Sequence, residues 1–95
     1  MRIPPKTGVV DIPADGATDN VALTDLKCSS VTLQAPAGNA GKIYIGGSDV
    51  TNASGANIGI ELLAGDAISN LYVDNLNHIY AAADTAGDDV RFLIV

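Results

Sequence analysis

Residues 31–46 decide the fold class, and they read VTLQAPAGNAGKIYIG. From Val31 to Ala35 the apolar side chains fall on alternate positions, which is typical of a β-strand with one buried and one solvated face. The segment PAGNAG follows at 36–41, and its Gly and Asn residues accept the positive φ angles that tight turns require. A second β-branched run begins at Lys42. The stretch therefore predicts a strand, a turn and another strand.

The same alternation of short strands and turns continues through the chain, with a spacing near ten residues that is typical of sandwiches and barrels. We predict an all-β fold: a small β-sandwich or jelly-roll-like barrel of about seven to eight short antiparallel strands. Residues 21–95 would form a single domain, preceded by residues 1–20 as an extended N-terminal arm or edge strand. Strands are expected at 21–24, 31–35, 42–46, 58–63, 68–73, 79–82 and 90–95.

The N-terminal region leaves two local alternatives open. Its prolines favour extended backbone, so Arg2–Pro13 is expected either to lie across a neighbouring subunit or to form an edge strand of its own sheet. Further along, Asp19 could cap a short helix within Thr18–Cys28, although Val21–Thr24 suits a strand equally well.

Size and composition predict one domain with a thin aliphatic core. The chain has 95 residues, of which 47% are hydrophobic, but 14 of these are Ala and only four are aromatic. The 25 Val, Ile and Leu residues suffice for two packed β-layers. A domain of this size has little margin of stability, which association could increase.

The net charge of −6 argues against a nucleic-acid partner, because the five Lys and Arg residues are scattered rather than clustered. No segment approaches the apolar length of about 18 residues that a membrane span needs. The N-terminus also lacks the apolar run of a signal peptide. We therefore expect neither nucleic-acid nor membrane binding.

The reactive side chains match no catalytic pattern, so we predict that the chain is not an enzyme and binds no cofactor. Lys42 follows Gly41, but the spacing is not that of a phosphate-binding loop. His78 and Cys28 are the only residues of their types, which is too few for a zinc site and offers no recognisable triad. Cys28 is expected to be a passive, buried thiol.

Loop carboxylates are the remaining candidates for metal binding. Asp15 with Asp19, Asp74 with its Asn neighbours, and Asp84 with Asp88 and Asp89 are oxygen-rich groups of the kind that Ca²⁺ prefers. None matches an EF-hand loop, and turn formation explains them, so no metal is predicted; a structural Ca²⁺ site is the alternative. Asn52 heads a glycosylation-like triplet that we interpret as a plain loop.

Two strands carry apolar residues on both faces. In 90–95, Val90, Phe92 and Ile94 share one face while Leu93 and Val95 join Arg91 on the other. In 68–73, alternation places Leu71 and Val73 opposite Ile68 and Tyr72. Part of the second face is therefore expected to be buried against another chain, the alternative being a strand buried within one domain. The candidate contact residues are Arg2, Ile3, Val9, Val10, Leu71, Val73, Leu93 and Val95.

Over about residues 31–95 the chain resembles small tailed-bacteriophage virion proteins of the head decoration, capsid cement or tail accessory type, and GVVDIPADGATDNVAL at 8–23 fits as a first part of the same pattern. The segments that carry the resemblance are VTLQAPAGNAGKIYIGGSDVT at 31–51, LLAGD at 62–66 and LYVDNLNHIYAAADTAGDDVRFLIV at 71–95. Their landmarks are turns and strands, so no functional residue is carried over from the family.

The resemblance implies a homo-oligomer, with a trimer as one option, made in the host cytoplasm and bound to the outside of a phage capsid. Its partner would be the major capsid protein, and it would stabilise the shell by bridging capsid subunits. The alternative is a tail or baseplate accessory module that binds the host surface, for which exposed loop aromatics are expected. The three Tyr residues lie on predicted strands and Trp is absent, which weakens that alternative.

Overall fold

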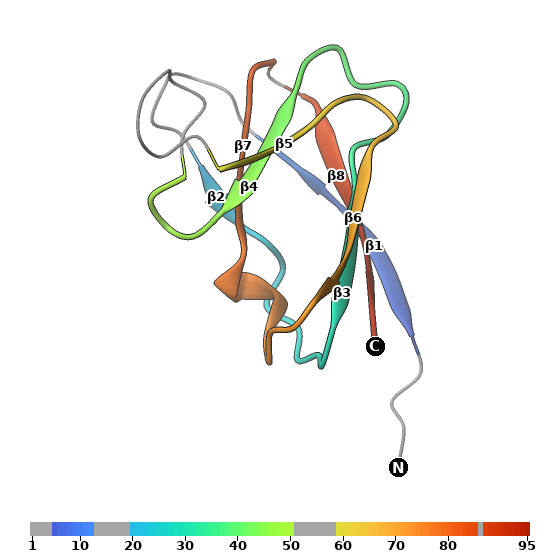
Figure 1. Ribbon diagram of the computed structural model, residues 1–95, viewed down its shortest axis with the longest axis vertical. Helices are drawn as coiled ribbons and strands as arrows, with labels where there is room; N and C mark the ends of the chain where they lie inside the picture. The colour runs from blue at the N-terminus through green and yellow to red at the C-terminus, as the bar shows by residue number, and fades with distance from the viewer. Residues whose placement is uncertain (1–4, 13–19, 51–58, 86) are drawn as a thin grey trace.

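The computed structural model describes residues 5–12, 20–50, 59–85 and 87–95, which form two four-stranded antiparallel sheets packed as a β-sandwich (Figure 1). The all-β prediction is confirmed. Sheet I has the order β1 (Lys6–Asp11), β8 (Asp89–Ile94), β3 (Val31–Gln34) and β6 (Ala67–Leu71). Sheet II has the order β2 (Val21–Ala22), β7 (Tyr80–Ala83), β4 (Ile43–Gly46) and β5 (Ile60–Leu62).

The strand pairs are nested along the chain. Strand β1 pairs with β8, β2 with β7, β3 with β6 and β4 with β5. The chain is thus one long hairpin that has been rolled up, and the β3–β8 and β4–β7 pairings close the roll. This winding is the jelly-roll arrangement of a sandwich. Every connection except β4–β5 crosses from one sheet to the other.

The core lies between the sheets and follows the predicted alternation. In β3, Val31 and Leu33 are buried while Thr32 and Gln34 are only partly covered. In β8, Val90, Phe92 and Ile94 are buried, whereas Arg91 and Leu93 are exposed and face away from the core. Sheet II contributes small as well as branched residues, so the core is thin. Its inner face supplies Ile43, Ile45, Leu62, Ala81 and Ala83.

The alternation predicted for residues 68–73 is wrong, because β6 contains a bulge. Leu71 pairs with Val31 and Ile68 pairs with Leu33, so β6 has one residue more than β3 over this stretch. The extra residue is accommodated at Asn70, whose backbone has a φ of 61°. Ile68 and Leu71 consequently pack against the same core, as does Val73. The strand ends at Leu71, earlier than expected.

The N-terminal alternatives are resolved for the described residues. Strand β1 pairs with β8 and is an edge strand of sheet I in the described part of the chain. Val21–Ala22 form strand β2 and the residues from 23 to 28 are not helical, so the helix alternative is wrong there. A short 3₁₀ turn, η1 (Leu76–His78), was not predicted; Asn75 caps it by accepting a hydrogen bond from the Asn77 backbone N–H.

Gly8 lies directly opposite Phe92, and the aromatic ring occupies the space beside it. A Cβ atom added at Gly8 would lie 2.5 Å from Phe92 Cζ, which is closer than van der Waals contact permits. An aromatic residue that covers a cross-strand glycine is a known way of fixing sheet register. The edge strand therefore needs glycine at this position.

We expect Gly8→Ala to lower the free energy of unfolding by about 1–3 kcal/mol, because the added methyl group overpacks against the ring. Urea unfolding measures the change, and the double variant Gly8→Ala with Phe92→Leu should recover part of it. Gly38→Ala is the matched control, since a Cβ there meets no atom within 4 Å. Equal unfolding curves for Gly8→Ala and the unmodified protein would contradict the close packing.

Candidate functional site

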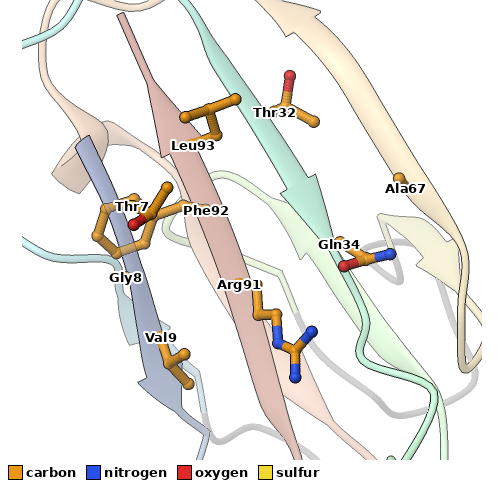
Figure 2. A pocket seen from close by; sticks show the side chains of 9 residues that line it. All are labelled: Thr7, Gly8, Val9, Thr32, Gln34, Ala67, Arg91, Phe92 and Leu93. Atoms are coloured by element: carbon orange, nitrogen blue, oxygen red, sulfur yellow. The ribbon is translucent and has the colours of Figure 1, made fainter. Parts of the chain in front are cut away.

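A shallow groove of about 510 Å³ crosses sheet I on the face that points away from the core (Figure 2). All four strands of the sheet contribute to it. Its lining consists of Thr7, Gly8, Val9, Thr32, Gln34, Ala67, Arg91, Phe92 and Leu93. A concave surface of this kind is a candidate site for contact with another molecule.

Strand register arranges the outward side chains in two rows. Val9 is opposite Arg91, Arg91 is opposite Gln34, and Gln34 is opposite Ala67. The neighbouring row contains Thr7, Leu93 and Thr32. Because side chains alternate along each strand, burial of the even-numbered residues of β8 forces these residues outward. Figure 2 shows them spread across the four strands.

Exposed apolar side chains gather on this face. Val9 is 58% exposed, Leu93 is 42% exposed and Val95, the next outward position after Leu93, is 50% exposed. Single exposed apolar residues are ordinary on protein surfaces. Val9 and Leu93 both line the groove, so the groove has exposed apolar surface on β1 and on β8.

Arg91 supplies the only charge in the groove lining. Its side chain lies in the middle of the row, between Val9 on β1 and Gln34 on β3 (Figure 2). Among the described residues the ion pairs are Lys42 with Glu61 and His78 with Asp74, so Arg91 has no carboxylate partner there. The groove thus has one central cation among uncharged side chains, some of them apolar and some polar.

The structure divides the eight candidate contact residues into three groups. Val9, Leu93 and Val95 are exposed on the outer face of sheet I. Val10, Leu71 and Val73 are partly buried and pack against the core. Arg2 and Ile3 lie outside the described residues.

Sequence reasoning missed the polar half of the groove. Thr32 and Gln34 line it because β3 pairs with β8, and Thr7 does so because β1 pairs with β8. The alternation of each strand signalled that these residues face outward, but no local signal identifies which strands are neighbours. Ala67 carries no sequence signal of a surface role.

The thiol of Cys28 is not activated. The side chain is buried, its Sγ donates to the Val73 carbonyl at 3.3 Å, and burial together with the charge of Asp74 raises its pKa. A reactive cysteine requires the opposite shift. His78 is exposed and its Nδ1 lies 3.2 Å from Asp74 Oδ1.

The loop carboxylates are used for structure. Buried Asp88 accepts hydrogen bonds from the backbone N–H groups of Ala40 at 2.9 Å and Gly41 at 2.8 Å. Asp84 Oδ2 accepts from the Tyr44 hydroxyl at 3.0 Å. Over the described ranges no group of three or more His, Cys, Asp or Glu is placed to hold a metal ion. Asp15, Asp19 and Asn52 lie outside those ranges.

Comparisons with protein-family models, with curated proteins and with solved structures found no match for this chain. Within the described residues, no helix has the length and apolarity to cross a membrane.

We expect Asp88→Ala to lower the free energy of unfolding by about 1–3 kcal/mol, since two backbone N–H donors lose their acceptor. Asp49→Ala is the control at an exposed carboxylate and should change stability by less than about 0.5 kcal/mol.

Thermal melts should be unchanged by EDTA, because the Asp88 oxygens already have donors. A melting temperature that rises with Ca²⁺ would contradict this assignment.

Stability should also depend on Tyr44 at high pH. Burial, the hydrogen bond to Asp84 and the nearby charges of Asp84 and Glu61 raise the pKa of Tyr44 to about 12. An unfolded tyrosine loses its proton near pH 10, so the fold favours the neutral phenol and the free energy of unfolding falls as pH rises from about 10 to 12. Unfolding curves of Tyr44→Phe across this range should show a smaller fall. An equal decrease of the free energy of unfolding with pH in the two proteins would contradict the raised pKa of Tyr44.

Proposed function

We propose that this chain is a structural virion protein, not an enzyme, which binds the outside of a tailed-phage capsid and bridges capsid subunits. The observation that carries the proposal is the outer face of sheet I, where Val9, Leu93 and Val95 are exposed around the groove. The resemblance of residues 31–51, 62–66 and 71–95 to small phage virion proteins supports it. The jelly-roll winding agrees as well, since viral capsid domains use it, although a fold by itself does not define a function.

The mechanism requires binding and no chemistry. A protein that binds the assembled shell and not its separate subunits stabilises the shell by mass action, to an extent set by its concentration and affinity. Bridging two subunits adds an effective local concentration for the second contact. The protonated state favoured for the buried Cys28 thiol and the structural use of Asp84 and Asp88 agree with such a passive role.

The proposal includes a homo-oligomer in the virion, with the major capsid protein as partner and synthesis in the host cytoplasm. The thin core of this small domain would gain stability from association. The net charge of −6 disfavours contact with packaged DNA, which fits a position outside the shell.

A tail or baseplate accessory module that binds the host surface is the second candidate. Tyr72 favours it, because this side chain follows β6 and is 78% exposed, which differs from the strand position expected of it. Stacking of sugars normally uses several aromatic side chains, and only one large aromatic is exposed among the described residues. The jelly-roll winding also occurs in lectins. These observations make it the weaker candidate.

Cryo-electron microscopy of purified virions of the phage that carries the gene tests the proposal. Density that fits the two-sheet domain on the outer capsid lattice is the expected result. Density confined to the tail would overturn the capsid assignment and support the second candidate. Mass spectrometry of the same particles provides the control, because absence of the chain would overturn both.

A further inference from the structure

We propose that two copies of the chain join edge to edge through β1, with the strands antiparallel and a two-fold axis at Val9, so that their two copies of sheet I become one continuous sheet. The inference rests on the proposed function, because that function includes a homo-oligomer. It adds the strand and the register through which the copies meet, and it can be tested with the purified chain.

Strand β1 is the long, regular edge among the described strands. The other edge of sheet I, β6, contains the bulge at Asn70, and the edges of sheet II are short, with two residues in β2 and three in β5. In contrast, β1 pairs with β8 over all six of its residues without a register shift. Sheets resist edge-to-edge association with short or bulged edge strands, and β1 has neither of these protections. A further strand can therefore be added beside β1, the outermost strand in Figure 2.

A hydrogen bond at the end of β1 identifies the backbone groups that point to its open edge. The Ile12 N–H donates to the Asp88 carbonyl at 3.0 Å, so Ile12 directs its backbone toward the strand that contains β8. Backbone groups of successive residues alternate between the two edges of a strand. Thr7, Val9 and Asp11 therefore direct their N–H and C=O groups away from β8. All three of these residues are exposed.

The hydrogen bonds on the other edge of β8 agree with this assignment. Ser30 and Val95, which follows β8, exchange two backbone N–H···O bonds of 3.3 and 3.1 Å. The odd-numbered residues of β8 thus bond toward β3, and its even-numbered residues bond toward β1. The residues of β1 opposite those even-numbered positions are Lys6, Gly8 and Val10. The odd-numbered residues of β1 are left for a further strand.

The outward groups of β1 are symmetric about Val9. If a second β1 lies antiparallel with the two Val9 residues opposite each other, Thr7 of each copy is opposite Asp11 of the other. All three positions are then hydrogen-bonded pairs, and at two bonds per pair the strands exchange about six. Two residues before Thr7 and two residues after Asp11 the sequence has Pro5 and Pro13, which have no N–H to donate. The prolines therefore favour a ladder centred on Val9.

The outward side chains favour the same strand from a second copy as the occupant. Val9 is 58% exposed and would be covered by the partner's Val9. Asp11 already has Asp89 opposite it within the chain, so its other side needs a donor and not a further acid. The hydroxyl of the partner's Thr7 is such a donor. An axis at Asp11 would instead place two Asp11 carboxylates opposite each other, which is unfavourable.

The remaining charge on this face does not oppose the pairing. Arg91 lies opposite Val9 on the next strand, so three strand spacings, about 14 Å, separate the two arginines of the dimer. This distance exceeds the Debye length of about 8 Å at physiological salt. Because each copy has a net charge of −6, low salt would favour dissociation, and the test uses an ionic strength of about 0.15 M.

The inference is tested by sedimentation equilibrium of the full chain between about 1 μM and 1 mM, the range in which weak complexes dissociate. The mass is expected to rise with concentration from 9.6 kDa toward twice that value. Val9→Lys should weaken the dimer about tenfold, because it places two ammonium groups opposite each other at the axis. The matched control is Leu93→Lys, which adds the same charge one strand further in and should keep the dimer.

A mixture of variants tests the two-fold register directly. Val9→Asp alone should also weaken the dimer, whereas an equimolar mixture of Val9→Lys and Val9→Asp should associate again, because opposite charges then meet at the axis. Thermal melts establish that each variant is folded. A chain that stays monomeric over the whole range, or a mixture that does not associate, would overturn the inference. Loss of the dimer in Leu93→Lys with retention in Val9→Lys would also overturn it, by identifying the groove face as the contact.

The result is distinguishable from a failure of the proposed function. If the chain is monomeric in solution but virions show it on the capsid with β1 unpaired, the dimer inference fails and the capsid role stands. If the chain pairs through β1 but is absent from virions, the capsid role fails and the edge-to-edge dimer stands.

Discussion

Strand β8 is paired along both of its edges, with β1 on one side and β3 on the other, and its register determines both surfaces of sheet I. Val90, Phe92 and Ile94 enter the core, while Arg91 and Leu93 line the groove. Because side chains in a strand alternate strictly, a slip of one residue would exchange the two sets. The hydrophobic core and the candidate contact surface therefore depend on the same alignment, and neither can change without the other.

Contacts near both ends of β8 hold this alignment. At its start, Asn39 Nδ2 donates to the Asp89 carbonyl at 2.8 Å and Asn39 Oδ1 accepts from the Asp89 N–H at 3.1 Å. The Asp88 carboxylate binds the same loop, and the Asp88 carbonyl accepts from the Ile12 N–H at 3.0 Å. Further along, the Phe92 ring fills the space that Gly8 leaves open. Polar contacts at one end and a steric fit nearer the other thus fix one register.

The sequence was sufficient to predict the fold class, because alternation in 31–35 and 90–95 and the glycine-rich turns are local signals. It was insufficient for β6, where Asn70 adopts a positive φ and places Ile68 and Leu71 on one side. Asparagine tolerates this conformation, but nothing in its neighbours demands it. The groove could be predicted only in part: Val9, Leu93 and Val95 follow from apolar content, whereas Thr32 and Gln34 join them through pairing between strands far apart in the chain.

The nesting of the strands also bears on the order of events during synthesis. Strand β1 leaves the ribosome first, yet its partner β8 lies at the other end of the described fold. At translation rates of about 5–20 residues per second, several seconds pass between the synthesis of β1 and that of β8. During this time β1 has no hydrogen-bonding partner. The surface that contains Val9 and Arg91 does not exist until these two strands join. A partner that recognises this surface would therefore bind fully folded molecules and would not bind nascent or misfolded ones.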